Sequence, residues 1–109
     1  MLIDLFDWHI RREGVAMNDG LTIHVGQDDS YLALYTGADR GRKQIPPGNI
    51  YLQRGGLNHI WIVVDDLAAI EAKVKSFGLQ THSHADDEPG TRFSFNDHDG
   101  VEFEVISYA

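Results

Sequence analysis

An internal repeat constrains the fold of this chain more than any other feature of its 109 residues. The segment LTIHVGQDDSYLALYTG (21–37) aligns without gaps on TRFSFNDHDGVEFEVIS (91–107), at a shift of 70 residues. Upstream, MNDG at 17–20 matches DEPG at 87–90 at the same shift. Identities within these segments are few, so the repeat rests on the hydrophobic pattern and on the placement of turns. It predicts two similar modules in one chain.

The second half of the chain predicts the order strand, helix, strand, strand, strand. Residues 57–64 are rich in β-branched and aromatic side chains, which favours a strand. Residues 67–77 carry apolar side chains at helical spacing, after an N-cap at Asp65 or Asp66 and before Gly78 as the C′ residue. Further strands are expected near 79–84 and over 92–96 and 101–107, the last two forming a hairpin around the turn DHDG.

The first module starts where the second module is already ending its helix. Phe6 matches Phe77 if one residue is inserted, so a first strand and most of a helix have no counterpart before Met1. Residues 38–56, with glycines, a Pro-Pro pair and basic side chains, are expected to link the modules. The predicted division is an incomplete first module (1–37), a linker (38–56) and a complete second module (57–109).

Composition excludes several classes of function. The chain has no cysteine, which excludes disulfides, thiolate metal sites and cysteine nucleophiles. The formal net charge of −8 argues against a nucleic-acid partner, whose phosphates would be repelled, and permits a cationic ligand. No apolar run approaches the roughly 20 residues of a membrane span, and the N-terminal apolar stretch is too short and too charged for a signal peptide. We therefore expect a cytoplasmic protein with no membrane association.

Two stretches, NHIWIVVDDLAAIEAKVKSFGLQ and EPGTRFSFNDHDGVEFEV, resemble the vicinal oxygen chelate superfamily of glyoxalase I, bleomycin-resistance proteins, extradiol dioxygenases and fosfomycin-resistance proteins. The shared pattern is a strand opening with His, a V-x-D-L helix start, a glycine at the helix end, an R-x-F-x-F-x-D-x-D-G hairpin and a Glu on the last strand. This pattern covers about half of the chain, and the first half matches more weakly through LFDWHI and the 21–37 hairpin. Each element alone is unspecific, and their order and spacing carry the resemblance.

The resemblance implies an α+β fold of paired βαβββ modules, whose strands form a half-open curved sheet around a cavity while helices cover the outer face. The first module would lack its first strand and most of its helix. In metalloenzymes of this superfamily the ligands come from the first and last strands of the modules. His59 matches the first-strand His of the second module and Glu104 its last-strand Glu, which makes both candidate metal ligands and Glu104 a candidate catalytic residue.

Strand alternation then divides the side chains between cavity and core, because successive residues of a strand point to opposite faces. With His59 and Glu104 directed inward, Trp61 and Glu102 share their face, and Phe103 packs against the helix. On the hairpin, polar side chains face the cavity as candidate substrate contacts: Arg92, Ser94 and Asn96. The shift of 70 adds Thr22, His24 and Leu34 on the cavity side of the first module, with His24 a further candidate substrate contact.

Imidazole plus carboxylate suits a divalent metal such as Fe, Mn, Zn or Ni, but two protein ligands are too few for firm binding. In the superfamily that this chain resembles, dioxygenases and fosfomycin-resistance enzymes take another His from the first strand of the first module. The repeat predicts that this strand is missing here. Glyoxalase I-type enzymes add a Glu on the last strand of that module, where the repeat places Leu34, so a four-ligand site is disfavoured. His24 could act as a third ligand from a different strand.

Three explanations stay open. The chain is a shortened reading of a longer gene, or a natural short form in which a partner chain fills the place of the missing strand, or a metal-free protein. In the last case His59 would bond to the backbone and Glu104 would pair with Arg92 across the hairpin. The H-x-H spacing of His82 and His84 places both on one strand face, which we expect to be exposed.

Two functions are therefore expected. The first is a metal-dependent lyase, transferase or dioxygenase acting on a small vicinal-oxygen substrate. The alternative is a metal-free protein that binds or sequesters a small molecule, resembling the bleomycin-resistance group, with a cationic aromatic ligand facing Trp61 and Glu102. Either version predicts a homodimer, because a module without its first strand leaves a sheet edge and apolar surface exposed.

Overall fold

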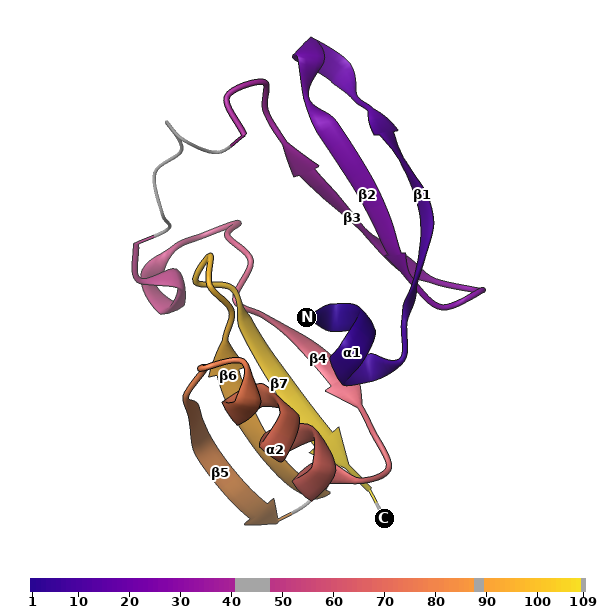
Figure 1. Ribbon diagram of the computed structural model, residues 1–109. Helices are drawn as coiled ribbons and strands as arrows, with labels where there is room; N and C mark the ends of the chain where they lie inside the picture. The colour runs from indigo at the N-terminus through magenta and orange to yellow at the C-terminus, as the bar shows by residue number, and fades with distance from the viewer. Residues whose placement is uncertain (41–47, 88–89, 109) are drawn as a thin grey trace. The chain divides into compact units, whose positions relative to one another are not determined.

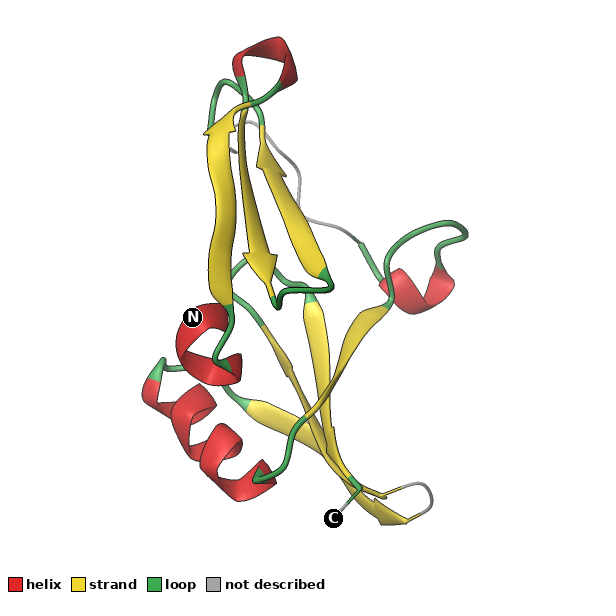
Figure 2. Cartoon of the chain, turned by 90° about the vertical axis from the view of Figure 1, so that its right-hand side faces the viewer, coloured by secondary structure: helices red, strands yellow, loops and turns green. Residues whose placement is uncertain are grey.

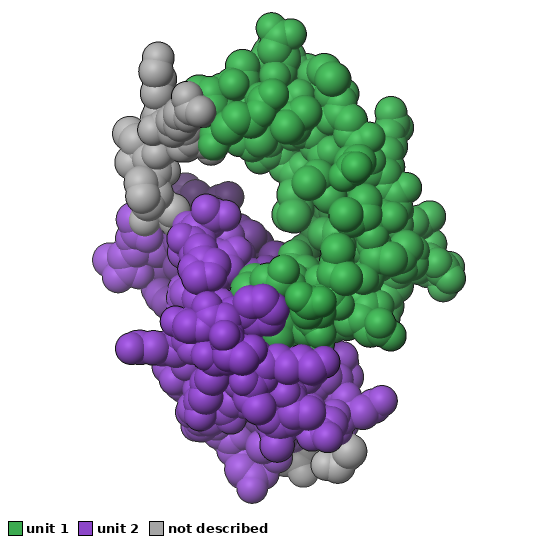
Figure 3. Space-filling view, viewed as in Figure 1, with its two compact units in different colours: residues 1–45 green, residues 46–109 purple. Residues whose placement is uncertain are grey.

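The computed structural model describes residues 1–40, 48–87 and 90–108 (Figure 1). Strands dominate and helices are few (Figure 2). The chain divides into two compact units, residues 1–45 and 46–109 (Figure 3). This boundary falls inside the segment expected to be a linker, of which residues 41–47 lie outside the described residues. The α+β class with two open sheets is confirmed.

The first unit is a short helix followed by a three-stranded antiparallel sheet in the order β1-β2-β3. Its elements are α1 (Leu2–Phe6), β1 (His9–Val15), the 3-10 turn η1 (Met17–Asp19), β2 (Leu21–Gly26) and β3 (Tyr31–Thr36). Helix α1 ends at Asp7 in the left-handed conformation (φ 56°) and contacts β2. Leu5 and Phe6 are buried, and the Phe6 ring lies 5.3 Å from that of Trp8.

The register between β2 and β3 corrects one expectation from the repeat. Leu34 pairs with Ile23, and Ala33 pairs with His24. Directly opposed residues of an antiparallel pair share a face, so Leu34 lies on the apolar face and not beside His24. The cause is the connection, because residues 27–30 join the paired ends of β2 and β3, whereas residues 97–101 join the equivalent strands of the second unit. The first loop is one residue shorter (four against five), so a gap-free alignment misassigns every side chain of β3.

The second unit has the strand, helix, strand, strand, strand order that the sequence predicts (Figure 1). Its elements are the 3-10 turn η2 (Ile50–Leu52), β4 (His59–Val63), α2 (Leu67–Ser76), β5 (Thr81–Asp87), β6 (Gly90–Asn96) and β7 (Glu102–Ser107). The sheet order is β4-β7-β6-β5, with β4 parallel to β7 and the other pairs antiparallel.

Helix α2 begins and ends where its capping residues require. The Asp66 carboxylate accepts a hydrogen bond from the Ala69 backbone N–H at 3.1 Å, which satisfies a donor that the first helical turn leaves unpaired. Gly78 follows the helix with φ +80°, a conformation that favours glycine. In the part of the chain that the structure describes, no helix is long and apolar enough to cross a membrane.

The core of the second unit lies between α2 and one face of the sheet. Val74 of α2 is fully buried, as are Phe93, Phe95 and Val105, while Phe103 is 3% exposed. Phe95 and Phe103 stack with ring centroids 5.2 Å apart. This face takes the large apolar side chains that alternation predicts, which leaves the opposite face of the sheet for polar groups.

A β-bulge overturns the expectation that His82 and His84 share a face. The β5–β6 register shifts between His82 and Ala85, and Ser83 has φ 57°. An extra residue in a bulge breaks the alternation of side chains, so the two histidines point to opposite sides of the sheet. The His82 Nε2 lies 2.8 Å from Asn96 Oδ1, whereas the His84 Nε2 lies 2.6 Å from Glu71 Oε2 on α2.

Candidate functional site on the second sheet

One face of the second sheet brings together the candidate site residues of that unit. In the parallel pair β4–β7, His59 lies opposite Glu102 and Trp61 opposite Glu104. In the antiparallel pair β6–β7, Ser94 lies opposite Glu104 and Asn96 opposite Glu102. All of these side chains point away from the α2 side of the sheet because each alternates with a core residue. Arg92 shares this face.

Glu104 is the centre of the arrangement. Its Oε2 lies 3.0 Å from His59 Nε2, and its Oε1 lies 3.2 Å from Arg92 Nε. The Glu104 side chain is 17% exposed and that of His59 31% exposed, so the pair is largely withdrawn from solvent. A partly buried carboxylate of this kind needs opposite charge or hydrogen-bond donors on both oxygens, and here each oxygen has one.

The other nitrogen of His59 is also engaged. Its Nδ1 lies 2.6 Å from Asn58 Oδ1, so His59 bonds to side chains and not to the backbone. With the Nδ1 proton donated to Asn58, the Nε2 faces the Glu104 carboxylate with either a second proton or a metal cation between them. A partner of this kind on the far ring nitrogen is what orients a metal-binding histidine.

A second polar row lies beside the first and includes two residues that sequence reasoning missed. The Tyr51 hydroxyl donates a hydrogen bond to Glu102 Oε1, and His82 contacts Asn96 as described above. The hydrogen bond to Glu102, followed by burial and by the negative charges of Glu102 and Glu104, raises the pKa of Tyr51 above 10.0. Tyr51 lies in a turn without strand periodicity, so nothing in the sequence marked it. The H-x-H spacing marked His82 as a strand residue, but only the bulge brings it to this face.

The remaining candidates differ in their surroundings. Trp61 is 49% exposed, and its ring lies 6.3 Å from that of His59. Ser94 is buried. His24 belongs to the first unit, where its ring stacks on Tyr31 at 4.6 Å and 14°.

The donor set fits two ligands of a divalent metal. Adjacent ligands about 2.1 Å from a metal and at right angles to each other are about 3.0 Å apart, which matches the separation of His59 Nε2 and Glu104 Oε2. No group of three or more metal-binding side chains gathers among the described residues. The β3 position equivalent to Glu104 by register is Ala33, which offers no ligand for a glyoxalase I-type set.

The fold and the family that the sequence matches define a class of protein, the vicinal oxygen chelate proteins. The family model of the Glyoxalase/Bleomycin resistance protein/Dioxygenase superfamily matches residues 3–105, and the chain belongs to this superfamily. No curated protein matches the sequence.

Solved structures share the fold at low sequence identity. A glyoxylase/bleomycin resistance protein/dioxygenase domain from a Frankia species has a TM-score of 0.77 at 17% identity, over 97% of this chain and 82% of that one. An antibiotic-binding protein from a Streptomyces species has a TM-score of 0.67 at 14% identity, over 99% and 81%. A fosfomycin resistance protein from Mesorhizobium loti has a TM-score of 0.64 at 20% identity, over 96% and 75%.

Proposed function

We propose that this protein is a metal-dependent lyase, transferase or dioxygenase acting on a small vicinal-oxygen substrate. The observation that carries the proposal is the convergence of His59 Nε2 and Glu104 Oε2 at 3.0 Å, with Asn58 behind the imidazole. Superfamily membership supports it, since the fold includes a fosfomycin resistance protein and a glyoxalase I. His59 and Glu104 would hold a divalent ion such as Fe, Mn, Zn or Ni.

When bound, such an ion supplies a Lewis acid that polarises substrate oxygens. The chain's own residues have separate tasks in this proposal. Arg92 holds the second oxygen of Glu104 and so fixes the direction in which the carboxylate points. Asn58 fixes the orientation of the His59 ring. Substrate contacts are proposed for the polar and aromatic side chains of the same face: Arg92, Ser94, Asn96, Trp61 and Glu102. For His24 of the first unit, a substrate contact stays a prediction from the sequence.

The test is metal binding by the purified chain, measured by calorimetric titration with Mn²⁺, Ni²⁺ and Zn²⁺. We expect one ion per chain, with His59→Ala and Glu104→Gln each weakening affinity at least ~10-fold and Asn58→Ala weakening it about 10-fold through the lost orientation. His82→Ala is the matched control because it removes another imidazole from the same face. Absence of binding by the wild-type chain, or equal losses in the His59 and His82 variants, would sink the proposal.

A metal-free binding protein is the second candidate, and a specific observation favours it. Arg92 already neutralises Glu104, and the part of the chain that the structure describes offers no third metal ligand. The half-exposed Trp61 on the same face suits an aromatic ligand. Titration with cationic aromatic compounds should then quench Trp fluorescence in the chelator-treated protein and not in its Trp61→Phe variant. A quench that persists in Trp61→Phe would report on Trp8 and contradict this candidate.

We further propose a cytoplasmic homodimer. Several apolar side chains of the first unit are exposed in a single chain, including Val15 at 79%, Leu34 at 44% and Ile23 at 38%. Contiguous apolar surface of this kind is rare on monomers.

A further inference from the structure

A pocket of about 500 Å³ lies between α2 and the strands β5 and β6, within the second unit. Its apolar walls are Leu67 and Ala68 of α2 and Ala85 of β5, and its polar groups include Glu71 and His84. Neither ligand of the metal site proposed above lines it. Its volume falls in the range of roughly 300–1,000 Å³ that small-molecule sites have, so it can hold a small organic molecule.

The His84 ring is held in one orientation by its neighbours. Its Nε2 lies 2.6 Å from Glu71 Oε2, and the Thr81 hydroxyl donates to the same oxygen. The hydrogen bonds from Thr81 and His84 lower the pKa of Glu71, so this carboxylate is ionised at neutral pH and can only accept. The proton of the His84–Glu71 bond therefore belongs to His84 Nε2. The ring also stacks on Phe93, with centroids 6.0 Å apart at 26°.

The other nitrogen of His84 is the group that this network leaves open. In a neutral imidazole whose proton is on Nε2, the Nδ1 is a hydrogen-bond acceptor. This Nδ1 makes no hydrogen bond to any residue that the structure describes. Hydrogen bonds in a chain polarise one another, so the carboxylate on Nε2 makes Nδ1 a stronger acceptor. The pocket thus offers an oriented acceptor beside apolar walls.

The charges around the pocket favour a neutral ligand. The Lys75 Nζ lies 3.7 Å from Glu71 Oε2, and Arg92 also lines the pocket. On the opposite wall, Asp86 Oδ1 accepts a hydrogen bond from the Thr91 hydroxyl at 3.0 Å. Cations and carboxylates are both present, so neither sign of ligand charge gains electrostatic complementarity.

We propose that this pocket binds a small neutral phenol, whose hydroxyl donates a hydrogen bond to His84 Nδ1 while its ring packs against Leu67, Ala68 and Ala85. A phenol combines one strong donor with a flat apolar body, which matches one acceptor and an apolar wall. This binding requires no metal and does not rest on the function proposed above.

The experiment is an NMR titration of the chelator-treated protein with 4-fluorophenol and, separately, with 4-fluoroanisole, which has the same ring but no hydroxyl donor. 4-Fluorophenol should shift the backbone amide resonances of residues 67–71 and 84–86 in a saturable way. 4-Fluoroanisole should bind at least ~5-fold more weakly, because it cannot donate to Nδ1. The imidazole ¹⁵N spectrum should show His84 protonated on Nε2, and its Nδ1 resonance should move when 4-fluorophenol is added.

Two substitutions on opposite sides of β5 test the role of the imidazole. His84→Phe keeps a ring against Phe93 and removes the acceptor, so it should lower the affinity for 4-fluorophenol at least ~5-fold. His82→Phe makes the same change on the other side of the sheet and should leave the affinity within about 2-fold.

A second pair of variants keeps the test valid if His84→Phe disturbs the fold. Ala68→Leu adds a side chain at an exposed helix position that lines the pocket, and it should weaken 4-fluorophenol binding at least ~5-fold by occupying the space. Ala69→Leu, exposed on the same helix, should not. Equal affinities for the two compounds, His84 protonated on Nδ1 instead, or an unchanged affinity in both His84→Phe and Ala68→Leu would overturn the proposal.

Discussion

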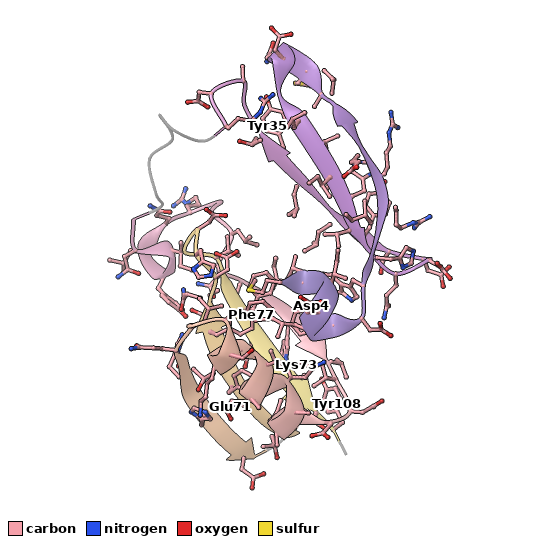
Figure 4. All side chains as sticks on the ribbon, viewed as in Figure 1. Asp4, Tyr35, Glu71, Lys73, Phe77 and Tyr108 are labelled. Atoms are coloured by element: carbon pink, nitrogen blue, oxygen red, sulfur yellow. The ribbon has the colours of Figure 1, made fainter. Side chains whose placement is uncertain are left out.

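Single carboxylates organise both faces of the second sheet. On the site face Glu104 joins His59 and Arg92, and on the helix face Glu71 of α2 joins Thr81 and His84. Glu71 belongs to α2, like Lys73, and its carboxylate contacts His84 of β5 (Figure 4). Hydrogen bonds from Thr81 and His84 lower the pKa of Glu71 below its usual 4.5.

The lowered pKa of Glu71 predicts a pH-dependent stability. Because the folded-state pKa is depressed, the ionised carboxylate stabilises the fold fully above about pH 4.5, and this contribution is lost as pH falls through the folded-state value. Glu71→Gln should therefore lower the free energy of unfolding by about 1 kcal/mol at pH 7, with the difference from wild type shrinking below pH 4.5. Urea unfolding at several pH values measures this, with Asp65→Asn as a control. A deficit that grows on acidification would contradict the assignment.

At the scale of elements, the bulge in β5 decides which side chains reach the site. Because of the bulge, His82 contacts Asn96 on one side of the sheet and His84 contacts Glu71 on the other. Strand β1 also has a register shift, between Ile10 and Arg12. Ser83 occupies the bulge with a positive φ that an L-residue adopts at a cost.

The strained position of Ser83 predicts opposite effects of one substitution at two sites. Ser83→Gly should raise the free energy of unfolding by about 0.5 kcal/mol, because the relief of backbone strain exceeds the added entropy of the unfolded chain. Ser76→Gly, at the end of α2, should lower it by about 1 kcal/mol because glycine is a poor helix former. Thermal and urea unfolding measure both. Destabilisation by Ser83→Gly would show that the Ser83 side chain matters more than its backbone conformation.

At the scale of the whole molecule, the apolar face of the first sheet predicts self-association. Leu34 and Ile23 pair across β2 and β3 and are both exposed in a single chain. Sedimentation at micromolar concentration should show a dimer. Leu34→Lys should convert the dimer to a monomer, because it places a charge on the face that the dimer would bury. Ala33→Lys places the same charge on the opposite face of the same strand and should leave the dimer intact. A wild-type monomer, or equal effects of both substitutions, would refute the association proposed.

Much of the second unit was predictable because its signals are local. Asp66 marks the start of the helix and Gly78 marks its end. The alternation of Phe93 and Phe95 with Arg92 and Ser94 defines the two faces of the hairpin. The candidate pair His59 and Glu104 followed from the same alternation together with the family resemblance. Such signals depend on a few neighbouring residues, so they survive without knowledge of the tertiary structure.

Register and contacts across elements needed the tertiary structure. The one-residue difference between the loops at 27–30 and 97–101 moved Leu34 to the apolar face, and the bulge at Ser83 separated His82 from His84. The partners of Glu102 and Glu104 come from distant parts of the chain, Tyr51 for one and His59 with Arg92 for the other. The sequence by itself determined the elements of the second unit and the faces of its regular strands, because these follow from side-chain periodicity. Only folding decided which charges meet, because strand pairing turns a single inserted residue into a change of face.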